Sequence, residues 1–154
     1  MTVNGHQVVR LEFSSAFEML DFVQVVSDHI GRSIGLDEDS VHWVGVAIRE
    51  SVINAIKHGN RNDQGKHVFV EFATASPPAA PELNIRVRDE GEGFDPEVIA
   101  DPLAPENLLK SSGRGIFLIR NFMDDVQLQR APQGGMEIRM VKRVQASADG
   151  SVQA

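Results

Sequence analysis

Residues 41–60 read V-H-W-V-G-V-A-I-R-E-S-V-I-N-A-I-K-H-G-N and set the architecture of the chain. Apolar residues recur at helical spacing on two sides of this stretch, which predicts a helix from about Ser40 to His58. The dipeptide Gly59-Asn60 is typical of a helix end. A helix that is apolar on nearly all sides belongs in the interior of the fold.

Two polar residues, Glu50 and Asn54, interrupt one apolar side of this helix. Because they are four residues apart, their side chains point almost the same way. A carboxylate and an amide on a buried face need partners, and a hydrated magnesium ion is a suitable one because it takes few protein ligands and keeps waters. The alternative is that both side chains are exposed or pair with nearby basic groups.

The segments around this helix predict one domain over residues 1–145, followed by a small, polar tail at 146–154 that is expected to be disordered. A strand at Val8–Phe13 and a helix through Phe17–Ile30, capped by Ser14 or Ser15, come first. After the central helix the pattern predicts strands near 68–72, 83–87, 126–130 and 136–144, and a short helix at 115–122.

The resulting order, β-α-α-β-β-loop-α-β-β, lacks the regular alternation of a parallel α/β sheet. It predicts an α+β fold with a mostly antiparallel sheet and helices on one face.

The stretch D-E-G-E-G-F at residues 89–94 follows the strand near 83–87. Asp89 continues the apolar alternation of that strand, so its carboxylate is expected on the core side at the strand end. It can accept a hydrogen bond from a ligand amine there, and Gly91 and Gly93 let a ligand approach the backbone closely. The alternative is a surface turn that ends the strand.

A third glycine-containing stretch, Gly113-Arg114-Gly115, opens the last predicted helix. Glycines that lead into a helix N-terminus offer backbone N–H groups and a positive dipole end to phosphate, although a plain hinge is the alternative. The region between Gly91 and Gly113 predicts a long loop, of the kind that is usually functional or mobile. The last helix is expected to contribute to the core Phe117, Phe122 and Met123.

Composition narrows the function classes. The 154 residues carry a net charge of −7, which disfavours a direct nucleic-acid binder because such proteins need a basic footprint. The absence of cysteine excludes disulfides, thiolate zinc sites and a cysteine nucleophile. No apolar run approaches the ~20 residues that span a bilayer, and no signal peptide is recognisable, so the sequence predicts a cytoplasmic protein without a membrane anchor.

Taken together and in this order, the three stretches resemble the N, G1 and G2 boxes of the ATP-binding family shared by gyrase, Hsp90, histidine kinases and MutL. These stretches are E-S-V-I-N-A-I-K-H-G-N at 50–60, D-E-G-E-G-F at 89–94 and G-R-G-I-F-L-I at 113–119. Within that family, N-A-I-K-H-G-N and R-N-F-M-D-D-V at 120–126 resemble the anti-sigma-factor serine kinases of bacteria. The resemblance extends over about Val8 to Val144.

The resemblance implies a two-layer α/β sandwich of the Bergerat type that binds ATP and Mg²⁺. It implies that Asp89 binds the adenine amino group and that Gly91 and Gly93 shape the adenine pocket. It also implies that Asn54 coordinates magnesium and that Glu50 is the general base.

At the phosphate end, the resemblance implies that Gly113 and Gly115 offer backbone to the phosphates and that a lid covers them over about 96–112. Lys110 and Arg114 are the nearest cations for the γ-phosphate. Some family members carry arginine where this chain has Ser111, which puts the efficiency of transfer in question.

The implied function is that of a kinase that phosphorylates a serine of an anti-anti-sigma protein of the STAS fold and sequesters a sigma factor, as a possible homodimer. One alternative is a nucleotide-gated binding module of the same fold without kinase activity, which the serine at position 111 supports. Another is a detached histidine-kinase catalytic domain. We rank it lower because the chain shows no helical pair bearing a phosphoacceptor histidine.

Overall fold

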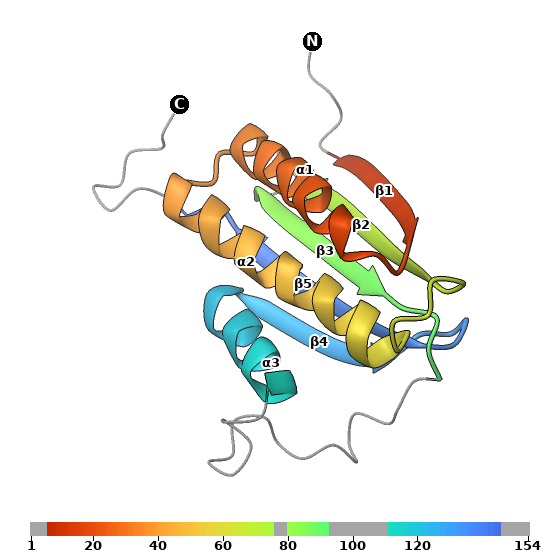
Figure 1. Cartoon of the computed structure of the whole chain (residues 1–154). Coiled ribbons are helices and arrows are strands. Elements are labelled where there is room, and N and C mark those ends of the chain that lie inside the picture. Colours follow the sequence, from red (N-terminus) through yellow and green to blue (C-terminus); the bar gives the residue numbers. More distant parts are fainter. Residues whose placement is uncertain (1–5, 76–79, 93–110, 146–154) are drawn as a thin grey trace.

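The computed structural model describes residues 6–75, 80–92 and 111–145, which form a five-stranded sheet with helices packed on one face (Figure 1). The elements are β1 (His6–Ser14), the 3-10 helix η1 (Phe17–Met19), α1 (Leu20–Ser33), α2 (Glu38–Asn54), the π-helix η2 (Ala55–Gly59), β2 (His67–Ala75), β3 (Glu82–Arg88), α3 (Ser111–Phe122), β4 (Asp125–Arg130) and β5 (Met136–Arg143).

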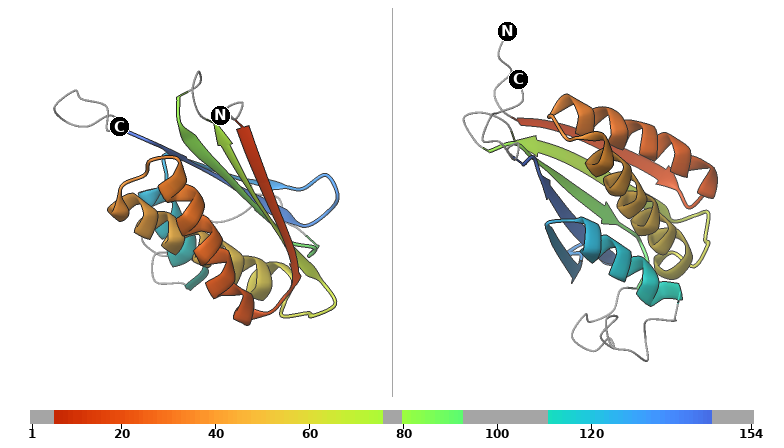
Figure 2. Two further views of the ribbon diagram at one scale, coloured as in Figure 1. Left: turned by 90° about the horizontal axis from the view of Figure 1, so that it is seen from above. Right: turned by 90° about the vertical axis from the view of Figure 1, so that its left-hand side faces the viewer.

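The strand order is β1-β2-β3-β5-β4, and every neighbouring pair is antiparallel. The views in Figure 2 show α1, α2 and α3 on the same side of this sheet. The predicted α+β architecture, with an antiparallel sheet and helices on one face, is therefore confirmed.

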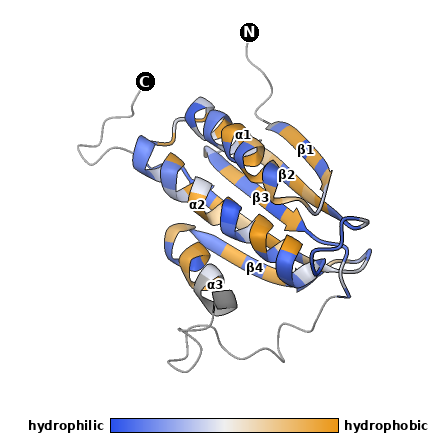
Figure 3. Ribbon diagram, viewed as in Figure 1, coloured by the Kyte–Doolittle hydropathy of each residue, from blue (hydrophilic) through white to orange (hydrophobic). Residues whose placement is uncertain are grey.

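The core lies between the sheet and α2, and alternation along the strands produces it. Residues of β2 and β3 are alternately buried and more exposed, and Figure 3 shows the matching alternation of hydropathy along these strands. From α2, the predicted stripe of Val41, Val44, Ile48 and Val52 is buried against the sheet. Burying each of these side chains stabilises the fold by about 1.5–3 kcal/mol, which is an upper estimate.

The predicted serine cap of the first helix is wrong. Ser14 is the last residue of β1, and the Ser15 hydroxyl donates to the Lys66 carbonyl oxygen at 2.8 Å. Neither η1 nor α1 has a side-chain cap, because Ser15 instead connects the end of β1 to the turn that precedes β2. By contrast, α2 is capped, since the Asp37 side chain accepts from the Ser40 N–H at 2.7 Å.

The central helix ends in a wider turn than a regular α-helix. After Asn54 the chain continues as the π-helix η2, in which the Asn60 N–H donates to the Ala55 carbonyl oxygen at 2.7 Å. The end predicted at Gly59-Asn60 is therefore confirmed, but the last turn holds one extra residue per hydrogen-bonded ring. Such π-turns are frequent at functional sites.

Helix α3 begins at Ser111, four residues before the predicted start, and packs against α2. The rings of Trp43 and Phe122 stack with centroids 3.9 Å apart and planes 9° apart. Met123 is buried and Phe122 is partly buried, but Phe117 is 38% exposed, so the prediction that Phe117 belongs to the core is wrong. No helix in the described ranges is both long and apolar enough to cross a membrane.

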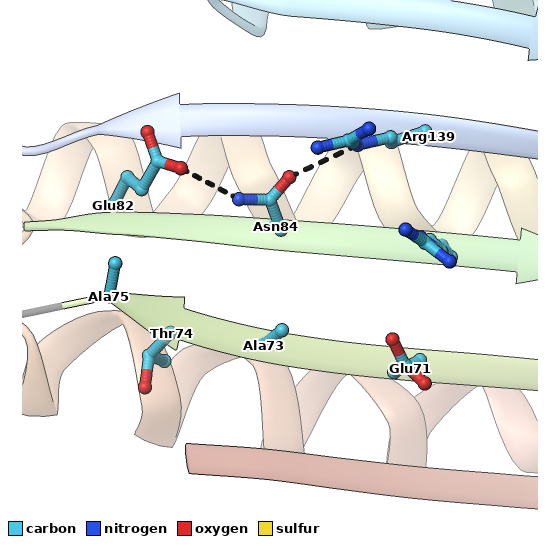
Figure 4. A pocket seen from close by; sticks show the side chains of 8 residues that line it. Glu71, Ala73, Thr74, Ala75, Glu82, Asn84 and Arg139 are labelled. Atoms are coloured by element: carbon cyan, nitrogen blue, oxygen red, sulfur yellow. Dashed lines mark hydrogen bonds between the residues drawn. The ribbon is translucent and has the colours of Figure 1, made fainter. Parts of the chain in front are cut away.

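The opposite face of the sheet carries a shallow depression of about 260 Å³ (Figure 4). Within it, the Asn84 side chain donates to Glu82 at 2.8 Å and accepts from Arg139 at 3.3 Å. This depression is separated by the sheet from α2, so it is not the place where the predicted nucleotide-binding residues lie. Its remaining lining residues are Glu71, Ala73, Thr74, Ala75 and Arg86.

Candidate functional site

Asp89 lies directly after β3, on the core side that its alternation predicts, and is only 5% exposed. One of its carboxylate oxygens, Oδ1, accepts from the Gly91 N–H at 2.9 Å and from the Met136 N–H at 3.1 Å. The Asp89 N–H donates to the Met136 carbonyl oxygen at 3.0 Å, so the start of β5 fixes this residue from both sides. Among the described residues, the hydrogen-bond donors to this carboxylate are thus backbone N–H groups.

Burial raises the pKa of the Asp89 carboxyl above its ordinary value, while the N–H groups of Gly91 and Met136 act in the opposite direction. The second oxygen, Oδ2, has no hydrogen-bond partner within the described part of the chain. An oxygen of this kind can accept a hydrogen bond from a ligand amine, which would also stabilise the ionised form.

Three glycines surround Asp89 so closely that a side chain would not fit. A Cβ on Gly59 would lie 2.0 Å from Asp89 Oδ2, one on Gly91 would lie 2.1 Å from the Gly59 carbonyl oxygen, and one on Gly135 would lie 2.1 Å from the Asp89 carbonyl oxygen. Gly135 also has a positive φ of 80°. Gly59 and Gly135 were not predicted as site residues, because their positions after a helix and in a hairpin explain a glycine without any site.

Glu50 and Asn54 lie on the same side of α2 and are both partly exposed. The backbone of α3 lies against them, since a Cβ on Gly115 would be 3.0 Å from Asn54 Nδ2 and 3.2 Å from Glu50 Oε2. Among the residues that the structure describes, neither side chain has a hydrogen-bond or ion-pair partner. The pair is therefore available to a ligand at the point where α3 approaches α2.

These two groups of residues lie along the C-terminal half of one helical stretch and form the two ends of the candidate site. Glu50 and Asn54 belong to α2, while Gly59, next to Asp89, is the last residue of η2. A ligand that uses both ends needs a hydrogen-bond donor at Asp89 and metal-binding or anionic groups at Glu50 and Asn54. A nucleoside triphosphate combines these features.

Some of the predicted residues lie outside the part of the chain that the structure describes. These are Gly93 and residues 96–110 of the expected lid, which include Lys110. Gly113 and Arg114 belong to the first turn of α3, which also includes the last two residues expected in the lid.

The polar groups at Glu50 and Asn54 suit a cation that brings most of its own ligands. The described ranges contain no group of three or more His, Cys, Asp or Glu side chains that could hold a metal ion alone. Magnesium fits this donor set, because it binds one or two protein oxygens together with waters and substrate phosphates.

The chain is similar to several known proteins. A family model described as histidine kinase-like ATPase domain matches residues 14–142. An anti-sigma F factor of Oceanobacillus iheyensis is 31% identical over 141 residues, which cover 89% of this chain and 92% of that protein. Serine-protein kinase RsbW of the same organism is 24% identical over 148 residues, covering 92% of this chain and 90% of that protein.

Among solved structures, the chain is similar to the RsbU and RsbW domains of Rv1364c from Mycobacterium tuberculosis, with a TM-score of 0.62 and 17% identity. The match covers 89% of this chain and 32% of that longer chain. At this identity the likeness concerns the fold alone.

Proposed function

Because the chain belongs to the histidine kinase-like ATPase domain family, we propose that it is an ATP-dependent protein serine kinase of the anti-sigma-factor type. The names of the relatives, anti-sigma F factor and serine-protein kinase RsbW, support this role. The observation that carries it is the approach of Gly115 to Glu50 and Asn54, which brings a base, an amide and a helix N-terminal region together.

At the base-binding end, Asp89 Oδ2 accepts a hydrogen bond from the adenine amino group. The burial of Asp89 supports this role, since a buried carboxylate gains most from a donor that reaches it without water. Gly91 and Gly93 shape the adenine pocket, and the absence of a side chain at Gly59 lets the Asp89 carboxylate pack against the end of η2.

At the phosphate end, Gly113 in the first turn of α3 presents its backbone N–H to the phosphates, Gly115 lets the helix backbone lie close to Asn54, and Lys110 and Arg114 add positive charge. Asn54 holds magnesium through its amide oxygen. When bound, the metal neutralises negative charge on the phosphates, which is the main requirement of phosphoryl transfer.

Glu50 acts as the general base. Its carboxylate takes the proton of the incoming serine hydroxyl as that oxygen bonds to the γ-phosphorus and the bond to the ADP oxygen breaks. The partial exposure of Glu50 supports this role, because a serine from another protein must reach it.

The protein substrate and partners follow from the same proposal. We infer a serine of an anti-anti-sigma protein of the STAS fold as phosphoacceptor, a sigma factor as the sequestered partner, and a homodimer as the working form. Residues 1–145 make up the domain and residues 146–154 its tail. The cytoplasm, where sigma factors work, is the proposed location.

The proposal is tested by incubating the protein with labelled ATP, Mg²⁺ and a STAS protein encoded beside it. We expect acid-stable, base-labile phosphate on the STAS serine, and none with the Glu50→Gln variant. The absence of phosphoserine at every Mg²⁺ concentration would contradict the kinase. Partner binding that depends on ATP and is unchanged by Glu50→Gln would then favour a nucleotide-gated module. Acid-labile phosphate would favour a histidine kinase.

A further inference from the structure

Asn60, the residue that follows η2, is completely buried, with an exposed fraction of 0%. Its Nδ2 donates to Ser15 Oγ and to the His67 carbonyl oxygen, both at 2.9 Å. Its Oδ1 accepts from the Glu90 N–H at 2.8 Å. One side chain thus connects the ends of β1 and η2 with the start of β2 and the loop after β3, and both donors of the amide are used.

The loop that Asn60 contacts is the one that carries the adenine-binding end of the site. Besides its bond to Asn60, Glu90 accepts from the His67 N–H through Oε1 at 2.6 Å. Gly91 packs directly on the Gly59 carbonyl oxygen, at a spacing that admits no Cβ. Gly59 and Asn60 therefore locate Glu90 and Gly91 against η2, while Asp89 is held by Met136.

The position of this loop determines how Asp89 presents its carboxylate. Gly91 donates to Oδ1, and the remaining oxygen, Oδ2, faces Gly59. If the Glu90 N–H loses its acceptor, this part-buried amide is left without its protein partner and the loop has reason to shift toward solvent. A shift of Gly91 would then remove one of the two N–H groups that hold Oδ1, leaving only that of Met136, and so change the direction of Oδ2.

We propose that Asn60 is a positioning residue for adenine recognition, which it controls by fixing the Glu90-Gly91 backbone beside Asp89. This inference rests on the proposed role of Asp89 in binding the adenine amino group. It assigns Asn60 no contact with the nucleotide.

The test compares the affinities of ATP and inosine triphosphate, which carries an oxygen where adenine has its amino group. The wild-type chain should prefer ATP, since the carboxylate accepts from the amine and repels the oxygen. In Asn60→Ala the ratio of the two dissociation constants should fall about tenfold, which corresponds to the loss of one well-placed hydrogen bond. The affinity for inosine triphosphate should stay within about twofold, since the phosphate end is unchanged.

Ser15→Ala is the matched control. It removes one acceptor of Asn60 Nδ2 but leaves the bond between Oδ1 and the Glu90 N–H. We expect a lower Tm and an unchanged ratio of the dissociation constants for ATP and inosine triphosphate. If Asn60→Ala does not fold, Asn60→Ser is measured instead, because its shorter hydroxyl cannot reach the Glu90 N–H but leaves room for water.

The outcomes separate this inference from the proposed function. If the wild-type chain binds both nucleotides equally, the role of Asp89 fails and this inference fails with it. A second outcome is that the wild-type chain prefers ATP while Asn60→Ala leaves the ratio of the two dissociation constants unchanged. In that case Asn60 has only a structural role, even if the variant binds both nucleotides more weakly to the same extent. The positioning role is supported if the ratio of the two dissociation constants falls in Asn60→Ala and stays unchanged in Ser15→Ala.

Discussion

The two ends of the candidate site differ in how complete they are without a ligand. At Asp89, backbone N–H groups satisfy one carboxylate oxygen, and three glycines exclude side chains from its surroundings. At Glu50 and Asn54, no described residue pairs with either side chain, and the backbone of Gly115 lies close to both.

Because of this difference, the two ends are suited to different tasks, one to recognition of the base and the other to phosphoryl transfer. A rigid end recognises a ligand with little loss of conformational entropy on binding, and so it is suited to choosing the base. An end that lacks partners gains them from the ligand, and so it is suited to holding phosphates, a metal ion and a second substrate that must enter and leave. The predictions below test whether this division is real, from the largest expected effect to the smallest.

The largest effect is expected at the open end. Glu50→Gln keeps the shape of the side chain but removes the base, so phosphoryl transfer to the STAS protein should fall about 10³-fold. The dissociation constant for ATP, measured by calorimetry, should change less than about threefold, because Asp89 and its glycines are untouched. A variant that loses ATP binding and transfer to the same extent would show that the two ends are not separate.

The next effect is expected at the rigid end. Asp89→Asn replaces an acceptor by a donor at the proposed position of the adenine amine, and the affinity for ATP should fall about 30-fold, the range of a lost hydrogen bond to a charged group. The affinity for inosine triphosphate should fall less or rise. Equal losses for both nucleotides would exclude Asp89 from base recognition.

The same variant has a predicted stability effect. Burial raises the pKa of Asp89 in the folded chain above its ordinary value of 3.8, so the folded chain takes up a proton first as the pH falls. The ionised carboxylate therefore lowers the stability of the wild type at pH 7, and Asp89→Asn should have the higher urea midpoint there. The difference in urea midpoint between the variant and the wild type should decrease as the pH is lowered toward 4. A difference that increases would contradict the expected direction of the pKa shift.

The smallest effects come from a matched pair of substitutions, Gly59→Ala and Gly115→Ala. At Gly59 the new methyl group would lie 2.0 Å from Asp89 Oδ2, so we expect lower stability, by about 1–3 kcal/mol, and weaker ATP binding. At Gly115 the nearest atoms are the ends of the Asn54 and Glu50 side chains, at 3.0 and 3.2 Å, which can move.

Gly115→Ala should therefore leave the Tm unchanged or slightly higher, because alanine favours a helix over glycine by up to about 1 kcal/mol. Its effect should appear as a two- to fivefold weaker response of ATP binding to Mg²⁺, an estimate based on a small displacement of Asn54. Thermal unfolding and Mg²⁺ titration of both variants check the pair. Equal destabilisation by the two changes would mean that the ends are equally rigid.

Local patterns predicted much of this molecule. Helical spacing gave α2 and the shared direction of Glu50 and Asn54, and alternation along β3 placed Asp89 on the core side. These features depend on neighbours within a few residues, which is why a single sequence contains them.

The residues that were missed depend on contacts far apart in the chain. Asn60 looks like an ordinary helix-end residue, and only Glu90, 30 positions later, reveals its role. Ser15 looked like a helix cap but bonds to Lys66, 51 positions away. Gly135 contacts Asp89 across β3 and β5. Patterns among neighbouring residues do not predict such contacts, because the contacts form only when the sheet assembles.

The stacking of Trp43 on Phe122 gives the protein a built-in optical signal. The chain has one tryptophan and no tyrosine, so fluorescence excited at long wavelength comes from this single ring. Because Phe122 is the last residue of α3 and Trp43 belongs to α2, the emission reports whether these helices remain in contact. A separation of α3 from α2 can thus be detected in real time, in the unlabelled wild-type protein.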